Sequence, residues 1–263
     1  MSIIKVENLN LSNVSFSDVK IDNHGRKMVY VNYNGGKILV QTPKMYVPNG
    51  IKRWRKKDAV DNKDDSFEME MSFRGEDKSD KNSLAINEFH KKLLEFDSLL
   101  KGTIMTRSKE WLGKQKVSME TIEDAYYSPC VKIPTDKNGM VLDYPSRVRV
   151  KLDREREFDS DNFTGRFLSN KKYKTPVLIF DESKTQIDIN ESNFDVVVPK
   201  GSQAVAVLEL VYISITSKVS AKWKLVQAKV SKNQQNITGY AMLDDEQDTE
   251  DTEDTEDVLE NEQ

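Results

Sequence analysis

The chain has 263 residues with 40 basic and 44 acidic side chains, a formal net charge of −4, and it contains one cysteine and two histidines. One cysteine excludes an intrachain disulfide, and Cys130 with His24 and His90 makes a poor metal-binding set, so we expect no metal or other cofactor. No apolar run approaches the length that spans a bilayer, and the N-terminus lacks a signal-peptide pattern. We therefore expect a soluble protein that is made in the cytosol and is not secreted.

The first part of the chain has the pattern of β-strands. Residues 13–21 alternate apolar and polar side chains, which is the period of a half-buried strand. Residues 28–33 and 37–41 flank Asn34-Gly35-Gly36, in which glycine supplies the positive φ of a short hairpin turn. Residues 67–73 alternate again and place four apolar side chains on one face, so we expect another strand there.

Between these strands, residues 42–66 form a loop that is long for a compact domain, and such loops are commonly functional. Its middle combines six cations with a tryptophan and a tyrosine; cations neutralise phosphates, and an aromatic face stacks on a base. We expect DNA contacts from Lys44, Tyr46, Lys52, Arg53, Trp54, Arg55, Lys56 and Lys57. Two alternatives remain open. A nuclear-localisation signal explains the cations but not Trp54, and Trp54 could instead anchor the loop on the core.

Residues 80–113 predict the one strong helix, and a shorter helix is expected after Ser118, so the helical insertion covers about residues 80–126. The apolar side chains recur at steps of three and four: Ile86, Phe89, Leu93, Phe96 and Leu100. Asn82 or Ser83 is expected to cap the helix, and Gly102 to end or kink it. We assign this stripe to core packing and give it no chemistry.

Residues 146–153 alternate strictly, so that Arg147, Arg149 and Lys151 share one strand face. Three cations on one face need either solvent or an anion, and both a solvated edge and a DNA-binding face remain open. A basic and aromatic stretch follows, with Lys171, Lys172 and Tyr173 as further candidates, although nearby acids dilute its signal.

The longest predicted strand pair covers residues 203–216 and 219–230. In the first strand, one face holds Val205, Val207, Val211, Ile213 and Ile215, with Glu209 interrupting it. In the second, Lys222 and Lys224 lie opposite the face of Trp223. We therefore expect Trp223 to fill the core and the two lysines to be candidates for DNA contact.

The C-terminal segment 244–263 holds 12 carboxylates and no Lys or Arg, so residues 1–243 carry 40 basic and 32 acidic side chains, a net charge of +8. A stretch this acidic and this poor in apolar residues is expected to be disordered. A basic domain suggests a polyanionic partner, and the tail would then mimic that partner; the alternative is that the tail only keeps the protein soluble. Glu260 and Glu262 are the last two of the 12 carboxylates. A regulatory role is assigned to the other ten: Asp244, Asp245, Glu246, Asp248, Glu250, Asp251, Glu253, Asp254, Glu256 and Asp257.

Strands, a long helix and then strands predict a mainly β fold with an α insertion. An OB-type barrel over residues 1–243 has this order, with its helix between the third and fourth strands. A β-sandwich with a helical insertion would give the same pattern. No nucleophile elbow, P-loop, zinc-protease motif or dinucleotide fingerprint is present, so we expect a protein that is not an enzyme.

Several blocks carry a family resemblance: a hairpin, VQTPKMYVPNGIKRW, a helical insertion, SRVRVKL, PVLIFDE, VPKGSQAVAVLELVYIS, KWKLVQAKV and the acidic tail. Together they resemble the single-stranded DNA-binding proteins of nucleocytoplasmic large DNA viruses, which are similar to phage replication proteins with an OB fold and a regulatory acidic C-terminus. The resemblance covers nearly the whole chain and rests on the order of the blocks. One departure is that the phage tails end in an aromatic residue, whereas this chain ends in Glu262-Gln263, which leaves open how partners dock on the tail.

The resemblance implies sequence-tolerant binding of single strands during viral DNA replication, repair or recombination, in a cytoplasmic viral factory or the nucleus of an infected cell. It also implies homodimers and replication proteins as partners of the tail. Two alternatives remain: an acidic-tailed chaperone or assembly factor, and a structural virion component. The sequence does not decide between DNA and RNA, because stacking and phosphate contacts serve both.

Overall fold

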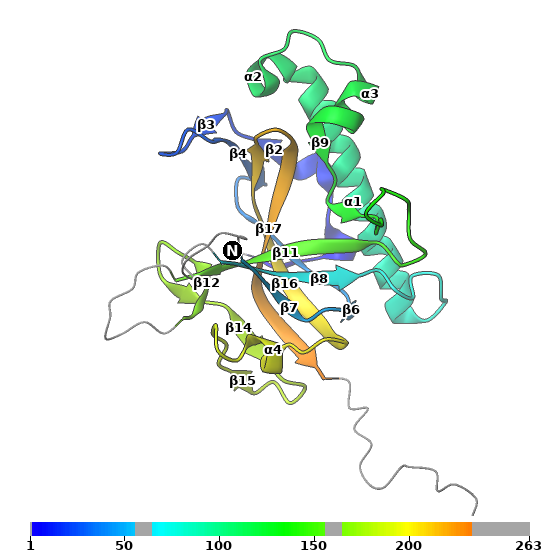
Figure 1. The fold of residues 1–263 in the computed structure, drawn as a ribbon, viewed down its shortest axis with the longest axis vertical. Helices are drawn as coiled ribbons and strands as arrows, with labels where there is room; N and C mark the ends of the chain where they lie inside the picture. Colours follow the sequence, from blue (N-terminus) through cyan, green and yellow to red (C-terminus); the bar gives the residue numbers. More distant parts are fainter. Residues whose placement is uncertain (1, 56–64, 156–164, 233–263) are drawn as a thin grey trace, which may run out of the picture. The chain divides into compact units, whose positions relative to one another are not determined.

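The computed structural model describes residues 2–55, 65–155 and 165–232, and Figure 1 shows its path. Contacts within the chain define one unit over residues 1–233 and a second over residues 234–263. The second unit lies outside the described residues, as do Lys56 and Lys57. The predictions of a disordered regulatory tail and of DNA contacts by these two lysines therefore remain predictions.

The described part is mainly β, with a long helix between strands. Before the helix lie β1 (Ile4–Lys5), β2 (Val14–Phe16), β3 (Lys20–Ile21), β4 (Lys27–Tyr33), β5 (Ile38–Gln41), β6 (Met45–Val47), β7 (Ile51–Trp54) and β8 (Ser66–Ser72), with the 3-10 turns η1 (Val6–Asn8) and η2 (Leu11–Asn13). The helical segment contains α1 (Lys81–Thr106), α2 (Ser108–Leu112), α3 (Met119–Thr121) and the π-helical η3 (Ile122–Tyr126). After it come β9 (Tyr127–Ser128), β10 (Val131–Lys132), β11 (Arg147–Arg154), β12 (Phe167–Asn170), β13 (Thr175–Pro176), β14 (Leu178–Phe180), β15 (Gln186–Ile187), α4 (Phe194–Val197), β16 (Ser202–Ile215) and β17 (Val219–Ser231).

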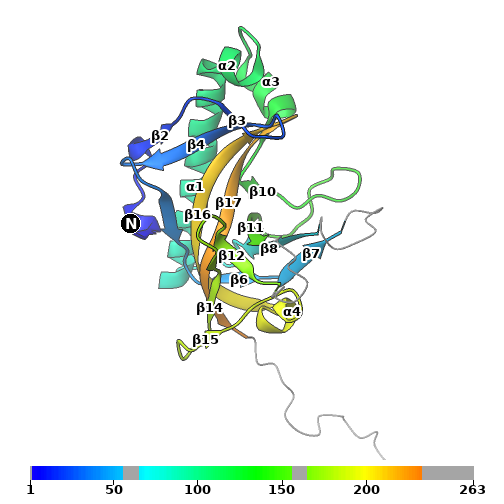
Figure 2. The ribbon, with the colours of Figure 1, turned by 90° about the vertical axis from the view of Figure 1, so that its left-hand side faces the viewer.

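The hairpin of β16 and β17 organises the sheet. One edge of β16 pairs with β17 along its length, and the other edge pairs in turn with β4, β5 and β6. The chain from β4 to β6 therefore follows β16 as one interrupted antiparallel strand. Figure 2 shows the long hairpin upright, with β2 and β4 on its left and β7, β8 and β11 on its right. Register shifts in β16 mark bulges, which bend a strand and let it serve several partners.

The strand pairings form a cycle. Tyr46 of β6 pairs with Ser72 of β8, β8 pairs antiparallel with β11, and Lys151 of β11 pairs with Lys224 of the parallel strand β17. Because β17 pairs with β16 and β16 with β6, the cycle runs β6–β8–β11–β17–β16 and returns to β6. The helical insertion enters between β8 and β11, the second and third of these strands in chain order, and not between the third and fourth as expected.

The predicted apolar stripe of α1 is confirmed, because all five of its side chains are buried in the core. The expected cap is wrong: the carboxylate of Asp80 caps the helix by accepting hydrogen bonds from the backbone N–H groups of Asn82 and Ser83, at 3.0 and 3.1 Å. Gly102 lies inside α1 and does not end it, whereas Gly113 ends α2 in the left-handed conformation with φ of 69°.

The two-residue turn at Asn34 and Gly35 is confirmed. Both residues have positive φ, 49° and 76°, and Tyr33 and Gly36 exchange their backbone hydrogen bonds. Beyond this turn the expected hairpin is not formed, because β4 and β5 pair with successive parts of β16. The strand expected over residues 13–21 is likewise divided into β2 and β3.

The expectation of one long loop over residues 42–66 is wrong, because β6 and β7 lie within it. Gly50 makes the connection between them possible. Its φ is 62°, and a Cβ atom there would lie 2.4 Å from the carbonyl oxygen of Val198. The positive φ of Gly50 turns the chain between β6 and β7, so Lys52, Arg53 and Trp54 lie on a strand.

The predicted inward face of β16 is wrong in its first half. Ala204, Ala206, Leu208 and Leu210 face the core there, and Val205 is only partly buried. The bulge between residues 210 and 212 then changes the alternation, which returns Ile213 and Ile215 to the core. The predicted burial of Trp223 on β17 is confirmed: Trp223 is 5% exposed and packs edge-on against Phe96 of α1, with ring centroids 6.3 Å apart. The expectation that Lys224 is exposed on the opposite face is wrong, because Lys224 is 8% exposed.

Across the described ranges, no helix combines the length and the apolar composition needed to cross a membrane.

Candidate nucleic-acid interface

Strand β7 divides the predicted basic cluster between two faces. Lys52 lies opposite Glu68 of β8, and Trp54 follows Lys52 on the same face. Arg53 and Arg55 alternate with them and lie on the other face. The indole of Trp54 is 48% exposed, so it does not anchor the chain on the core, and it is available for stacking.

The two arginines are held by one buried carboxylate. Asp65 accepts hydrogen bonds from Arg53 at 2.5 Å and from Arg55 at 3.2 Å. Burial by itself would raise the pKa of Asp65, but Arg55 and Arg53 more than offset this and lower the pKa below its ordinary value. Arg53 and Arg55 are exposed, but they lie on the other face of β7 from Lys52 and Trp54, and Asp65 fixes both guanidinium groups. We therefore leave them out of the interface.

The outer face of β8 and β11 brings cations and glutamates together in register. Lys52, Arg147 and Arg149 surround Glu68 and Glu70, and we call these five residues the paired cluster. Glu70 lies 3.4 Å from Lys52 and 3.1 Å from both Arg147 and Arg149, and Glu68 lies 3.0 Å from Arg149. The predicted alternation of β11 is therefore confirmed. Each of the three cations of the paired cluster, Lys52, Arg147 and Arg149, already has an acid partner.

Glu70 is the centre of the paired cluster. Burial by itself would raise its pKa, but Lys52, Arg147 and Arg149 lower it further than burial raises it. Glu70 is therefore ionised at neutral pH and offsets part of the positive charge of this face. An approaching phosphate would have to share these cations with two glutamates.

The β6 end of the same face carries Tyr46. Tyr46 pairs with Ser72 in register, and the guanidinium of Arg74 lies 5.1 Å from its ring centroid. Lys44, two residues earlier, is exposed and exchanges hydrogen bonds between its backbone and the side chain of Asn82. Sequence reasoning missed Arg74, because nothing near it in the chain shows that it covers Tyr46.

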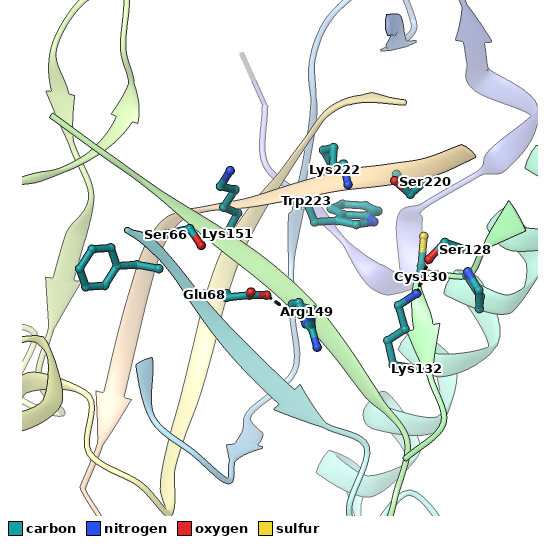
Figure 3. A pocket seen from close by; sticks show the side chains of 13 residues that line it. Ser66, Glu68, Ser128, Cys130, Lys132, Arg149, Lys151, Ser220, Lys222 and Trp223 are labelled. Atoms are coloured by element: carbon teal, nitrogen blue, oxygen red, sulfur yellow. Dashed lines mark hydrogen bonds and ion pairs between the residues drawn. The ribbon is translucent and has the colours of Figure 1, made fainter. Parts of the chain in front are cut away.

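A pocket of about 350 Å³ opens where β11 and β17 separate (Figure 3). The two strands meet at Lys151 and Lys224, and the segment from β9 to β10 then crosses between them. In Figure 3, Arg149 and Lys151 lie on one side of the opening and Lys132 and Cys130 on the other. We call this the seam pocket, lined by Ser66, Phe67, Glu68, Ser128, Pro129, Cys130, Lys132, Arg149, Lys151, Ser220, Ala221, Lys222 and Trp223.

Three lysines at the seam pocket form what we call the open cluster: Lys132, Lys151 and Lys222. Within residues 2–55, 65–155 and 165–232, none of the three forms an ion pair with a carboxylate; Lys132 donates to the hydroxyl of Ser128 at 2.6 Å. Partial removal from water lowers the pKa of Lys222, and the charges of Lys151 and Arg149 lower it further. Burial and nearby positive charge likewise lower the pKa of Lys132.

A buried carboxylate on α1 holds the crossing segment in place. Asp97 accepts hydrogen bonds from the hydroxyl of Tyr127 and from the backbone N–H groups of Cys130 and Val131, the latter two at 2.9 and 3.4 Å. Burial raises the pKa of Tyr127 and of the Cys130 thiol, so both stay neutral. The helical insertion therefore fixes the crossing segment, which forms one side of the seam pocket.

The remaining predicted residues lie near the C-terminal end of β11. Lys224 is 8% exposed, and its ammonium lies 3.8 Å from Asp153, which also binds Lys171 at 3.3 Å. We leave Lys224 out of the interface because it is buried and paired. Tyr173 is 71% exposed, and the ammonium of Lys172 lies 5.3 Å from its ring centroid.

Lys132 is the main residue that sequence reasoning missed. It stands alone between Pro129 and Pro134, with no local cluster to mark it. Its charged neighbours come from β11 and β17, which are distant in sequence. In the described part of the chain, no group of three or more His, Cys, Asp or Glu side chains is arranged to hold a metal ion.

Taken together, the fold and this surface define a β-rich protein with a basic, aromatic-bearing face suited to a polyanion. Comparisons with protein-family models and with curated protein sequences gave no match. Among solved structures, the chain is similar to gp2.5, a single-stranded DNA-binding protein encoded by bacteriophage T7, with a TM-score of 0.43, 9% identity, and coverage of 77% of this chain and 98% of that one. It is also similar to the single-stranded DNA-binding protein from bacteriophage Enc34 in complex with single-stranded DNA, with a TM-score of 0.36, 10% identity, and coverage of 78% and 90%.

Proposed function

We propose that the protein binds single-stranded DNA without strong sequence preference and performs no catalysis of its own. The observation that carries this proposal is the arrangement of Trp54, Lys151 and Lys222. Trp54 is about half exposed beside the paired cluster. Lys151 and Lys222, which form no ion pair within the described residues, line the seam pocket between β11 and β17. An exposed aromatic ring stacks on bases of any sequence, while unpaired cations hold phosphates.

The path of the strand follows from these positions. It starts at Trp54, crosses the outer face of β8 and β11, and reaches the open cluster. Tyr46 with Lys44 extends this path at the β6 end, and the exposed pair of Lys172 and Tyr173 is a further contact. The proposed interface therefore comprises Lys44, Tyr46, Lys52, Trp54, Arg147, Arg149, Lys151, Lys171, Lys172, Tyr173 and Lys222, joined by Lys132. Lys56 and Lys57 are added from the sequence pattern alone, because they lie outside the described residues.

The finer features of the proposal concern the fold and the biological setting. The cycle of five strand pairings supports an OB-type barrel in which the helix has moved to the second connection. The acidic tail competes with DNA for the basic face and recruits replication proteins when DNA displaces it. We place the protein in viral DNA replication, repair or recombination, as a homodimer in a viral factory or in the nucleus of an infected cell.

The experiment is fluorescence anisotropy of labelled oligo-dT with the full-length protein and with residues 1–243, over a salt series and with unlabelled duplex as competitor. We expect single strand to win over duplex, affinity to fall steeply with salt, and removal of the tail to tighten binding most at low salt. Equal affinity of the two proteins at every salt concentration would remove the competing role of the tail. No binding by either protein at low salt would overturn the function and favour the chaperone or virion role.

A further inference from the structure

The seam pocket differs from the rest of the basic face because it is concave. Its volume of about 350 Å³ lies within the range of roughly 300–1,000 Å³ in which proteins hold small ligands. A phosphate alone is much smaller than this space. The pocket therefore has room for a phosphate together with the group attached to it.

The charge of the pocket is also incompletely balanced. Four cations line it from three strands, whereas Glu68 is the one carboxylate among the described lining residues, and Glu68 is bound to Arg149 at 3.0 Å. Glu68 also lies in register with Lys151, so the four cations of the pocket share this one acid among its described lining residues. Holding like charges together in a partly desolvated space is unfavourable unless an anion enters.

The other walls of the pocket are apolar or neutral. Its apolar lining residues are Phe67, Pro129, Ala221 and Trp223, and three serines add hydroxyl groups: Ser66, Ser128 and Ser220. A carboxylate or a free phosphate would satisfy the lysines but would leave the apolar wall in water. A nucleotide unit matches both parts, since it joins an anionic phosphate to a flat base with polar edges.

We propose that the seam pocket receives one nucleotide of the bound single strand, with its phosphate among the lysines of the open cluster and its base against Pro129, Ala221 and Trp223. This inference rests on the proposed function and deepens it, because it names a discrete subsite. It also supplies a reason for preferring single strands: a base in a duplex has to unpair and unstack before it can enter a pocket.

The test uses charge-matched variants of the full-length protein. The double variant with Lys132→Gln and Lys222→Gln removes two cations from the pocket. The control double variant, with Lys81→Gln and Lys91→Gln, removes the same charge from exposed positions on α1. We expect the pocket pair to weaken oligo-dT binding about tenfold or more and the α1 pair to weaken it about twofold or less. Equal losses in the two pairs would overturn the pocket, while oligo-dT binding by the wild type would still uphold the proposed function.

Discussion

The paired cluster and the open cluster are both rich in cations, yet they differ in what surrounds each cation. In the paired cluster, Glu70 lies within 3.4 Å of three cations, and its pKa is lowered by them. At the open cluster, Glu68 is the one carboxylate among the described lining residues and it is bound to Arg149, and the pKa values of Lys132 and Lys222 are lowered. Acid partners thus stabilise the cations of the paired cluster, whereas holding the lysines of the open cluster together costs free energy.

This difference teaches that the number of basic residues does not measure how much positive charge a surface offers. On β8, Glu70 lies in register with Arg149, and Glu68 lies in register with Lys151. Glu68 binds Arg149 at 3.0 Å, however, and forms no ion pair with Lys151. Lys151 also lies opposite Lys224 across the seam, and like charges directly opposite each other destabilise a sheet. We therefore expect binding energy to come mainly from the open cluster and rigidity to come from the paired cluster.

The largest effect is expected from Glu70→Gln, which turns the paired cluster into an open one. The neutral side chain leaves Lys52, Arg147 and Arg149 without their shared acid, so we expect a loss of about 2–4 kcal/mol in the free energy of unfolding. Oligo-dT affinity should rise, with a steeper dependence on salt, because freed cations can contact phosphates. Urea unfolding and an anisotropy salt series measure the two effects.

The control for this change is Glu95→Gln on α1, where an exposed pair with Lys92 is removed. Surface pairs contribute little, so we expect a change below about 1 kcal/mol. If Glu70→Gln is as mild as Glu95→Gln, then Glu70 does not hold the paired cluster together.

A smaller effect is expected from Trp54→Ala, which tests whether the indole beside the paired cluster contributes to binding through stacking. Loss of the exposed indole should weaken oligo-dT binding by about 1–3 kcal/mol and leave the salt dependence unchanged, because no cation is removed. Leu84→Ala, an exposed apolar residue on α1, is the control and should leave affinity unchanged. Equal affinities of the two variants would show that no base stacks at Trp54.

The smallest effect is expected from alkaline pH, and it arises only in the open cluster. The folded-state pKa values of Lys132 and Lys222 lie below the ordinary value of 10.5. The unfolded chain therefore binds more protons than the folded protein in the pH window between the folded-state pKa and 10.5. The stability of the free protein should therefore rise with pH across that window, and oligo-dT affinity should fall as these lysines lose their charge. The charged and titratable groups that face them are Arg149, Lys151, Glu68, Cys130 and Asp97.

The measurement compares the wild type with the variant that carries Lys132→Gln and Lys222→Gln, from about pH 7 to about pH 10, by urea unfolding and by anisotropy. The variant should lack the extra pH dependence of the wild type. Identical pH profiles of the two proteins would mean that the open cluster titrates as ordinary lysines do.

Much of this arrangement follows from local patterns in the sequence. The alternation of β11 predicts which of its cations point outward, the alternation of β17 predicts that Trp223 fills the core, and the period of α1 predicts its buried face. The pattern fails where distant segments decide. The bulge near Tyr212 shifts the phase of β16, and Lys224 is buried beside Asp153 although its parity predicts exposure. Asp65 binds two arginines of the basic segment, and Lys132 gains its role only when β10 lies beside β11. Register, bulges and acid partners are set by tertiary pairing, so no local signal contains them.

The separation of β11 from β17 also makes this seam one of two places where the strand cycle is easiest to open. One residue pair joins β11 to β17, Lys151 with Lys224, and one joins β6 to β8, Tyr46 with Ser72, whereas β8 and β11 share a run of six in-register pairs. Segments with few backbone hydrogen bonds open with the smallest free energies. A DNA strand that contacts both sides of the β11–β17 seam binds only the closed form, so it raises the free energy of opening as its concentration exceeds its dissociation constant. One of the two weakest links of the cycle is thereby the one that its ligand reinforces.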